Sequence, residues 1–161
     1  MNSKTGRVNF ELPEDHWSGA SVESVWVDVV GSERYQINNI LSLVPQVSFR
    51  DVVAAKLEGD ALWFVHVIEK SGHSTVRLRW RHSLFPSFRR NSLLKQIDML
   101  GLGIEGGYFG GWRLLALDVP PHFAKPVLTS IIKEGESSKA WEAVLADDGG
   151  FESEWRNIWP I

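Results

Sequence analysis

Residues 71–75, Ser-Gly-His-Ser-Thr, combine the side-chain types that a hydrolase uses as nucleophile and base. A catalytic serine rarely stands next to its histidine in sequence, and the hydrolase elbow needs Gly-x-Ser-x-Gly, where this chain ends in Val76. Hydroxyl groups at this spacing more often bond to the backbone of a tight turn, here at Gly72. We therefore predict a turn and no catalytic residue, with a hydrolase built on His73 and Ser74 as the alternative.

Three arginines follow this turn at every second position. In a strand they would share one face, while Val76, Leu78 and Trp80 would share the other and meet the helices. Guanidinium groups bind carboxylates and phosphates. Two interpretations are therefore open: pairing with a carboxylate such as Glu142, or a site for an anion, a nucleotide or a nucleic acid. The second comprises Arg77, Arg79, Arg81, Arg89 and Arg90. Sheets that bind RNA usually present aromatic residues on their central strands, and that signature is missing here.

Other short motifs do not predict a cofactor. Gly101–Gly106 spells Gly-x-Gly-x-x-Gly, but it follows an expected helix, whereas the dinucleotide motif follows a strand. Ser92–Lys95 matches Ser-x-x-Lys without either companion motif. The five histidines lack metal-binding spacing and there is no cysteine, so we predict neither a metal site nor a cofactor.

The composition is that of a soluble globular protein. The 161 residues are 43% hydrophobic and 23% charged, which suits a single domain over 1–161. The absence of cysteine, of a secretory signal and of an apolar run long enough to cross a bilayer predicts a cytoplasmic location without membrane contact. Eight tryptophans are present, and we expect most of them in the core and the remainder on a binding surface.

The charges are distributed unevenly along the chain. Residues 1–70 carry 6 basic and 10 acidic side chains, residues 71–113 carry 7 and 2, and residues 114–161 carry 4 and 8. A positive middle segment between negative ends predicts internal charge pairing, an anionic ligand, or both.

Residues 1–70 have the pattern of a β-rich half. Residues 1–20 look like an irregular arm, and 21–31 alternate as a strand does. A second extended piece covers 35–44. Residues 45–70 form a hairpin around Gly59 and Asp60, with its second strand apolar on both faces and therefore buried on both sides. We predict a small twisted β-sheet or half-barrel.

The pattern of residues 71–147 predicts a second unit, in which strands and helices alternate. A strand at 74–80 precedes a helix at 89–103, which Gly101 closes, and two further strands reach to residue 119. A second helix at 121–135 has Phe123, Val127, Leu128, Ile131 and Ile132 on its inner side and Gly135 at its end. A strand at 139–146 follows. This β-α-β-β-α-β order is that of a ferredoxin-like sandwich, so the expected class is α+β. We expect the tail 148–161 to dock on this body.

Four short stretches resemble a known family. They are Asp51–Val53, Ser71–Arg77, Glu105 and Asp118–Pro121. Together they are similar to a bacterial family catalogued as domain of unknown function four-two-six-five, from about Val25 to Leu145. The family pattern has Gly where this chain has Arg50, and Pro-Phe where it has Leu41-Ser42. The resemblance implies a small bacterial cytoplasmic protein without an established activity. Members look like stand-alone modules from genomes rich in secreted antibacterial toxins, which associates the family with immunity.

These observations favour a non-enzymatic binding protein with a protein partner. Its most concrete form is an immunity protein that neutralises a nuclease-type toxin domain, because acidic side chains beside an aromatic anchor would complement a basic cleft. The expected contact residues are Asp147, Asp148, Glu152, Glu154, Trp155 and Trp159. The alternative is a nucleic-acid or nucleotide-binding module that uses the arginines.

Overall fold

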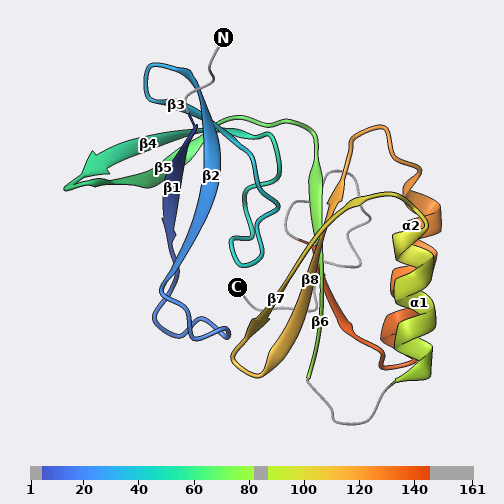
Figure 1. The fold of residues 1–161 in the computed structure, drawn as a ribbon. Coiled ribbons are helices and arrows are strands. Elements are labelled where there is room, and N and C mark those ends of the chain that lie inside the picture. The colour runs from blue at the N-terminus through green and yellow to red at the C-terminus, as the bar shows by residue number, and fades with distance from the viewer. Residues whose placement is uncertain (1–4, 82–86, 146–161) are drawn as a thin grey trace.

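The computed structural model describes residues 5–81 and 87–145, which form an α+β fold with two units side by side (Figure 1). One unit is a closed barrel of five strands. The other is a four-stranded sheet with two helices on one face, and the barrel lies toward the opposite face (Figure 1). The turn between β5 and β6 connects the two units.

The barrel is a meander of neighbouring antiparallel strands. Its strands are β1 (Thr5–Glu11), β2 (Val22–Gly31), β3 (Arg34–Ile37), β4 (Val52–Glu58) and β5 (Ala61–Glu69). Because an odd number of strands alternates in direction, the first and last run the same way, and β1 closes the barrel by pairing with β5 in parallel. The predicted hairpin around Gly59 is confirmed.

Strand β1 corrects the prediction of an irregular arm at residues 1–20. Val8 and Phe10 are buried inside the barrel, while their neighbours Arg7 and Asn9 are less buried, as in a strand with one face on a core. The strand has only two buried apolar residues, so its period-two signal is short. Because β1 pairs with both β2 and β5, the unit is a closed barrel and not a half-barrel.

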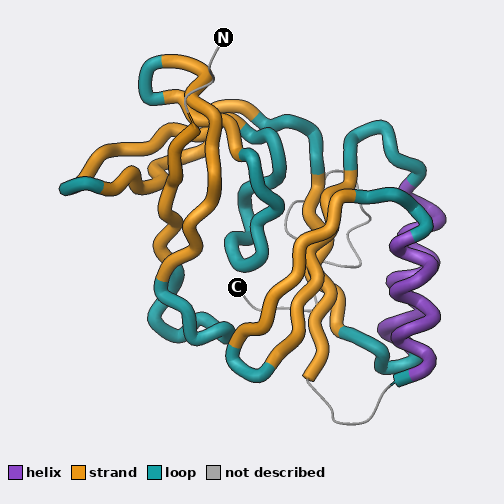
Figure 2. Tube along the Cα trace, viewed as in Figure 1, coloured by secondary structure: helices purple, strands orange, loops and turns teal. Residues whose placement is uncertain are grey.

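Two further predictions in this half are wrong. The extended piece expected at 35–44 ends with β3 at Ile37, and residues 38–51 follow an irregular path between the barrel and the sheet (Figure 2). Strand β5 was expected to be buried on both sides, but Val65 and His66 are exposed. The outer surface of a small barrel faces solvent, so only the inward side chains of β5 are covered.

The second unit has the element order that the sequence predicts. It consists of β6 (Ser74–Arg81), α1 (Phe88–Asp98), β7 (Gly103–Phe109), β8 (Trp112–Val119), α2 (Lys125–Ser137) and β9 (Glu142–Leu145). The strands lie in the order β7-β8-β6-β9 and all their pairs are antiparallel. The helix expected at 89–103 ends earlier, at Asp98, and Gly101 lies in the turn that follows, with a φ of 69° that suits a glycine.

The two faces of β6 have opposite roles, as its alternation predicts. Val76 and Leu78 are fully buried in one core with residues of both helices, and Trp80 packs against this core. The helical part of the core comprises Leu93, Ile97, Leu128, Ile131 and Ile132. The arginines of β6 therefore face the barrel unit.

Helix α2 begins at Lys125 and not at residue 121, so Phe123 packs against the core from outside the helix. Two positions within the helix also differ from the prediction. Val127 is 52% exposed, so it lies outside the expected apolar stripe. Gly135 does not end the helix, which continues to Ser137. A Cβ atom on Gly135 would stand 2.0 Å from Cε2 of Trp141, so this glycine lets the indole pack against the helix. The buried indole nitrogen of Trp141 donates to the carbonyl oxygen of Ile132 at 3.2 Å.

Candidate functional site

The turn at residues 71–75 lies where the barrel meets the sheet. The Ser71 amide donates to Oδ1 of Asp51 at 2.8 Å, and its hydroxyl donates to the carbonyl oxygen of Phe49 at 2.7 Å. Gly72 has a φ of 82°, and a Cβ there would lie 3.3 Å from Cβ of Pro121. A glycine suits both the left-handed backbone and this close approach. The predicted turn with hydroxyl-to-backbone bonding is thus confirmed at Ser71.

The Asp51 side chain is fully buried at the end of the 38–51 segment. Its Oδ2 atom accepts the Ser48 amide at 3.0 Å, and its Oδ1 atom lies 3.0 Å from the Ser71 hydroxyl. Lys70 places its ammonium group 3.3 Å from Oδ2, which compensates the buried charge. A buried carboxylate needs such partners, so this aspartate holds the end of the 38–51 segment to the turn.

His73 is oriented by a carboxylate from the sheet. Its Nδ1 atom lies 2.8 Å from Oδ1 of Asp118 at the end of β8, and both side chains are largely buried. Burial raises the pKa of Asp118, and the hydrogen bond to His73 opposes that shift. The ring of Phe49 meets the imidazole edge-on, with centroids 5.5 Å apart.

The geometry does not support a hydrolase built on His73 and Ser74. Ser74 is 1% exposed, and its hydroxyl has no hydrogen-bond partner among the described residues. It lies on the face of β6 that Val76 also occupies, toward the helices, because side chains two apart in a strand share a face. Thr75 is buried on the other face and donates to the Ser48 hydroxyl at 3.3 Å. The Ser71 hydroxyl contacts the amide of His73 at 3.1 Å and not its ring.

Arg77 is completely buried between the sheet and the 38–51 segment. Its guanidinium donates to the carbonyl oxygen of Leu41 from Nε at 3.1 Å and from Nη2 at 2.8 Å, and also to that of Val44. Burial lowers its pKa to about 10, and the negative charge of Glu23 opposes this shift. The group is therefore charged at neutral pH but closed to a ligand from solvent.

Glu23 of β2 completes this arrangement from the barrel side. Its carboxylate accepts the amides of Ser42 at 2.6 Å, Leu43 at 2.9 Å and Val44 at 2.9 Å. The same short stretch thus gives its amides to a carboxylate and its carbonyl oxygens to a guanidinium. The sequence analysis missed Glu23, because a polar residue in an alternating strand normally faces solvent and carries no signal of a partner.

Glu105 of β7 anchors the beginning of the 38–51 segment. Its Oε1 atom accepts the Ile40 amide at 3.2 Å and the side-chain amide of Asn39 at 3.3 Å. Irregular backbone that is covered by other elements must find hydrogen-bond partners outside itself. Side chains from β2, β6 and β7 supply them here.

The expected pairing with Glu142 is confirmed for one arginine of the row, Arg79. Its Nε atom lies 3.0 Å from Oε2 of Glu142 on β9, and its side chain is only 6% exposed. The guanidinium stacks on the rings of Trp17 at 4.8 Å and Trp112 at 4.3 Å. Arg81, at the exposed end of the strand, stacks on Trp112 at 4.2 Å.

The five arginines do not form one anion-binding surface, which corrects that alternative. Arg89 and Arg90 belong to α1, on the opposite face of the sheet from Arg77. Arg89 forms an ion pair with Glu134 of α2. Arg90 donates to the carbonyl oxygen of Ala140 and lies over the ring of Trp80. The arginines of β6 therefore make contacts on the barrel side of the sheet, and those of α1 make contacts on the helical side.

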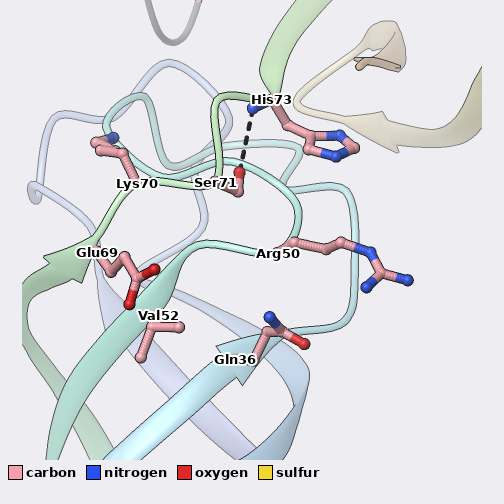
Figure 3. A pocket seen from close by; sticks show the side chains of 7 residues that line it. All are labelled: Gln36, Arg50, Val52, Glu69, Lys70, Ser71 and His73. Atoms are coloured by element: carbon pink, nitrogen blue, oxygen red, sulfur yellow. Dashed lines mark hydrogen bonds between the residues drawn. The ribbon is translucent and has the colours of Figure 1, made fainter. Parts of the chain in front are cut away.

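An open pocket of about 270 Å³ lies beside the turn (Figure 3). Its lining residues are Gln36, Arg50, Val52, Glu69, Lys70, Ser71 and His73. Arg50 has a φ of 65°, the left-handed conformation that favours glycine. Sequence reasoning found His73 but not Arg50 or Gln36.

The expected partner-binding residues Asp147, Asp148, Glu152, Glu154, Trp155 and Trp159 lie outside the described residues. Within 5–81 and 87–145, no three acidic or histidine side chains are grouped as ligands for a metal ion. Neither helix of the described chain combines the length and apolar character that crossing a bilayer requires.

Comparison with known proteins agrees with this geometry. The chain is similar in fold to a protein described as "Novel crystal structure of a hypothetical protein from Neisseria gonorrhoeae", with a TM-score of 0.71 and 22% identity over 94% of this chain and 100% of that one. No curated protein matches the chain. The family model described as Domain of unknown function (DUF4265) matches residues 23–143. The buried anchors Glu23, Asp51, Arg77 and Glu105 all fall within that range, and the chain belongs to the DUF4265 family.

Proposed function

We propose that this protein is a non-enzymatic binding protein of the bacterial cytoplasm, most concretely an immunity protein that neutralises a nuclease-type toxin domain by covering it. One observation carries the proposal. The signature side chains Asp51, Ser71 and Arg77 bond to one another or to backbone and hold the barrel to the sheet. Side chains used in this way build a rigid scaffold, which favours recognition over a reaction at these residues.

The distribution of charge supports an acidic contact surface. Two arginines of the positive middle segment pair with glutamates of the following segment, Arg79 with Glu142 and Arg89 with Glu134. The four acidic residues at 147–154 are therefore not needed for those pairs. Nuclease clefts are basic because they bind nucleic acid, so an acidic segment with an aromatic anchor complements them. We assign this contact to Asp147, Asp148, Glu152 and Glu154, with Trp155 or Trp159 as anchor.

The experiment is a pull-down of the full chain with the product of the adjacent upstream gene, followed by calorimetric titration of the pair. We expect direct binding, and we expect protection of cells that express that product. Reversing the four acidic residues to lysine should weaken binding by roughly tenfold or more, since complementary charge is lost at the contact. A matched control reverses four exposed acidic residues elsewhere in the chain, Glu14, Glu33, Glu58 and Asp60.

The outcomes separate the parts of the proposal. A control that binds as the parent does, beside a weakened tail variant, supports the assigned contact. Unchanged binding by the tail variant removes the tail as the contact. A chain that binds no product of its upstream gene and gives cells no protection argues against the immunity role itself.

We also propose that the unit formed by β6, α1, β7, β8, α2 and β9 is a ferredoxin-like sandwich. The β-α-β-β-α-β order and the strand order β7-β8-β6-β9 support this classification. A crystal structure of the chain tests it, and a different strand order in that structure would remove the classification.

A further inference from the structure

We propose that Arg50, His73 and Gln36 form a binding site for a small oxyanion, either a phosphate monoester or a carboxylate. The site is the open pocket at the junction of β3, the 38–51 segment and the 71–75 turn (Figure 3). It shares no residue with the acidic contact proposed above, so either proposal can fail without the other.

Arg50 presents an exposed cation to this pocket. Its guanidinium makes no hydrogen bond or ion pair with another residue of the described chain, and it lies 5.4 Å from the ring centroid of Phe49. Its backbone is in the left-handed region, where its amide donates to the carbonyl oxygen of Ile37 at 3.0 Å. A glycine would take this conformation without strain. Strain tolerated at an exposed cation points to a use for its side chain.

His73 supplies the second group. Asp118 and Phe49 hold its ring on one side, so Nε2 carries no bond to the described residues and is available to a ligand. Figure 3 shows the imidazole above and the guanidinium of Arg50 below, projecting to the same side of the turn, with the amide of Gln36 nearby. Three donors from three separate segments thus border one space. A fixed histidine beside a free guanidinium is an arrangement that suits an oxyanion.

The carboxylates near the pocket have their own partners. Asp51 is buried against Lys70 and Ser71, and Asp118 bonds to His73. Glu69 also lines the pocket, and its Oε2 atom lies 3.4 Å from Nη2 of Arg34. The charge of Arg50 acts on Asp118 and opposes the rise in its pKa, but the Arg50 guanidinium bonds to no carboxylate of the described residues. Its donors can therefore bind two oxygens of an incoming anion at once.

The test is a titration of the isotope-labelled full chain, followed by the side-chain NMR signals of His73. The probes are inorganic phosphate, phenyl phosphate and acetate, each at constant ionic strength with sodium chloride as balance. We expect a saturable shift of these signals in the millimolar range, because a bound oxyanion changes the surroundings of the imidazole. Binding of the phosphates alone assigns a phosphate site, and binding of acetate alone assigns a carboxylate site.

Two variants make the result specific. Arg50→Gly removes the cation while suiting the left-handed backbone, so it should fold and bind about tenfold more weakly, as expected for the loss of one charge-assisted pair. Arg113→Gln removes the same charge from β8 and should bind as the parent does. The proposal is overturned by a shift that does not saturate, by a shift that chloride reproduces, or by full binding in Arg50→Gly.

Discussion

The Nη2 atom of Arg77 lies 2.8 Å from the carbonyl oxygen of Leu41, so a buried guanidinium of the sheet holds the irregular segment of the barrel. The same segment gives three amides to Glu23. Barrel and sheet are thus joined by charged groups that saturate backbone polar atoms. Leu114 of β8 adds an apolar link, because it packs in the barrel core.

Replacing Arg77 should strongly destabilise the protein. In Arg77→Leu the carbonyl oxygens of Leu41 and Val44 lose their donor and Glu23 loses its nearby cation, so we expect a loss of about 3 kcal/mol or more in the free energy of unfolding. Urea denaturation measures it. Arg113→Leu, at an exposed position of β8, should cost less than about 1 kcal/mol. Equal losses in the two variants would contradict the anchoring role of Arg77.

Glu23→Gln tests the other side of the same contact. The neutral amide offers one acceptor oxygen where the carboxylate offers two, and its NH₂ group faces amide donors. We expect a loss of about 1–3 kcal/mol in urea denaturation. Glu33→Gln, at an exposed turn, is the control and should change stability by less than about 0.5 kcal/mol. A neutral effect of Glu23→Gln would mean that solvent already satisfies these amides.

Gly135→Ala should destabilise the protein although alanine favours helices. In an ordinary helix this change stabilises by roughly 1 kcal/mol. Here the new methyl group would overlap the indole of Trp141, and overpacking costs about 1–3 kcal/mol. The smaller ring in the double variant Gly135→Ala/Trp141→Phe should recover part of the loss relative to Trp141→Phe alone. Thermal denaturation checks both, and a more stable Gly135→Ala would show that the ring moves freely.

Arg50→Gly should leave the fold intact or stabilise it. Relief of the left-handed strain contributes about 1 kcal/mol, which the greater freedom of the unfolded glycine chain partly offsets. Arg34→Gly makes the same replacement in β3, where φ is not positive, and should lose roughly 0.5–1 kcal/mol. The midpoints of urea denaturation of the two variants measure these changes in stability. A larger loss in Arg50→Gly than in Arg34→Gly would show that the arginine side chain stabilises this turn.

Lowering the pH should reduce the contribution of His16 to the free energy of unfolding. Burial lowers the pKa of this histidine in the fold, and the charge of Glu23 opposes the shift. The folded protein therefore prefers the neutral ring, whose Nδ1 lies 2.7 Å from the Ser18 hydroxyl. The stabilisation is complete above the unfolded pKa of about 6.5 and is lost as pH falls through the lower folded value. The difference in stability between the parent and His16→Gln should shrink between about pH 7.5 and about pH 5. A constant difference would contradict this.

The sequence by itself determined the elements whose periodicity is long and whose ends carry a clear signal. The alternation in β6 predicted which face meets the helices, Gly59 marked the hairpin, and Gly101 marked the turn after α1. These features depend on neighbours in the chain, because local backbone geometry and the side-chain period produce them. The pairing of Arg79 with Glu142 was also within reach, since one charged face of a strand needs an opposite charge beside it.

Only the tertiary structure decided what the arginine face covers and which residues line the pocket. Glu23, Glu105 and Arg77 stand far apart in sequence, yet all bond to the segment at 38–51. No local pattern encodes that meeting, because it arises when the barrel closes through β1 and its irregular segment is pressed against the sheet. Closure depends on a long-range pairing, and the partners of a buried polar group are set by that packing and not by its neighbours in the chain.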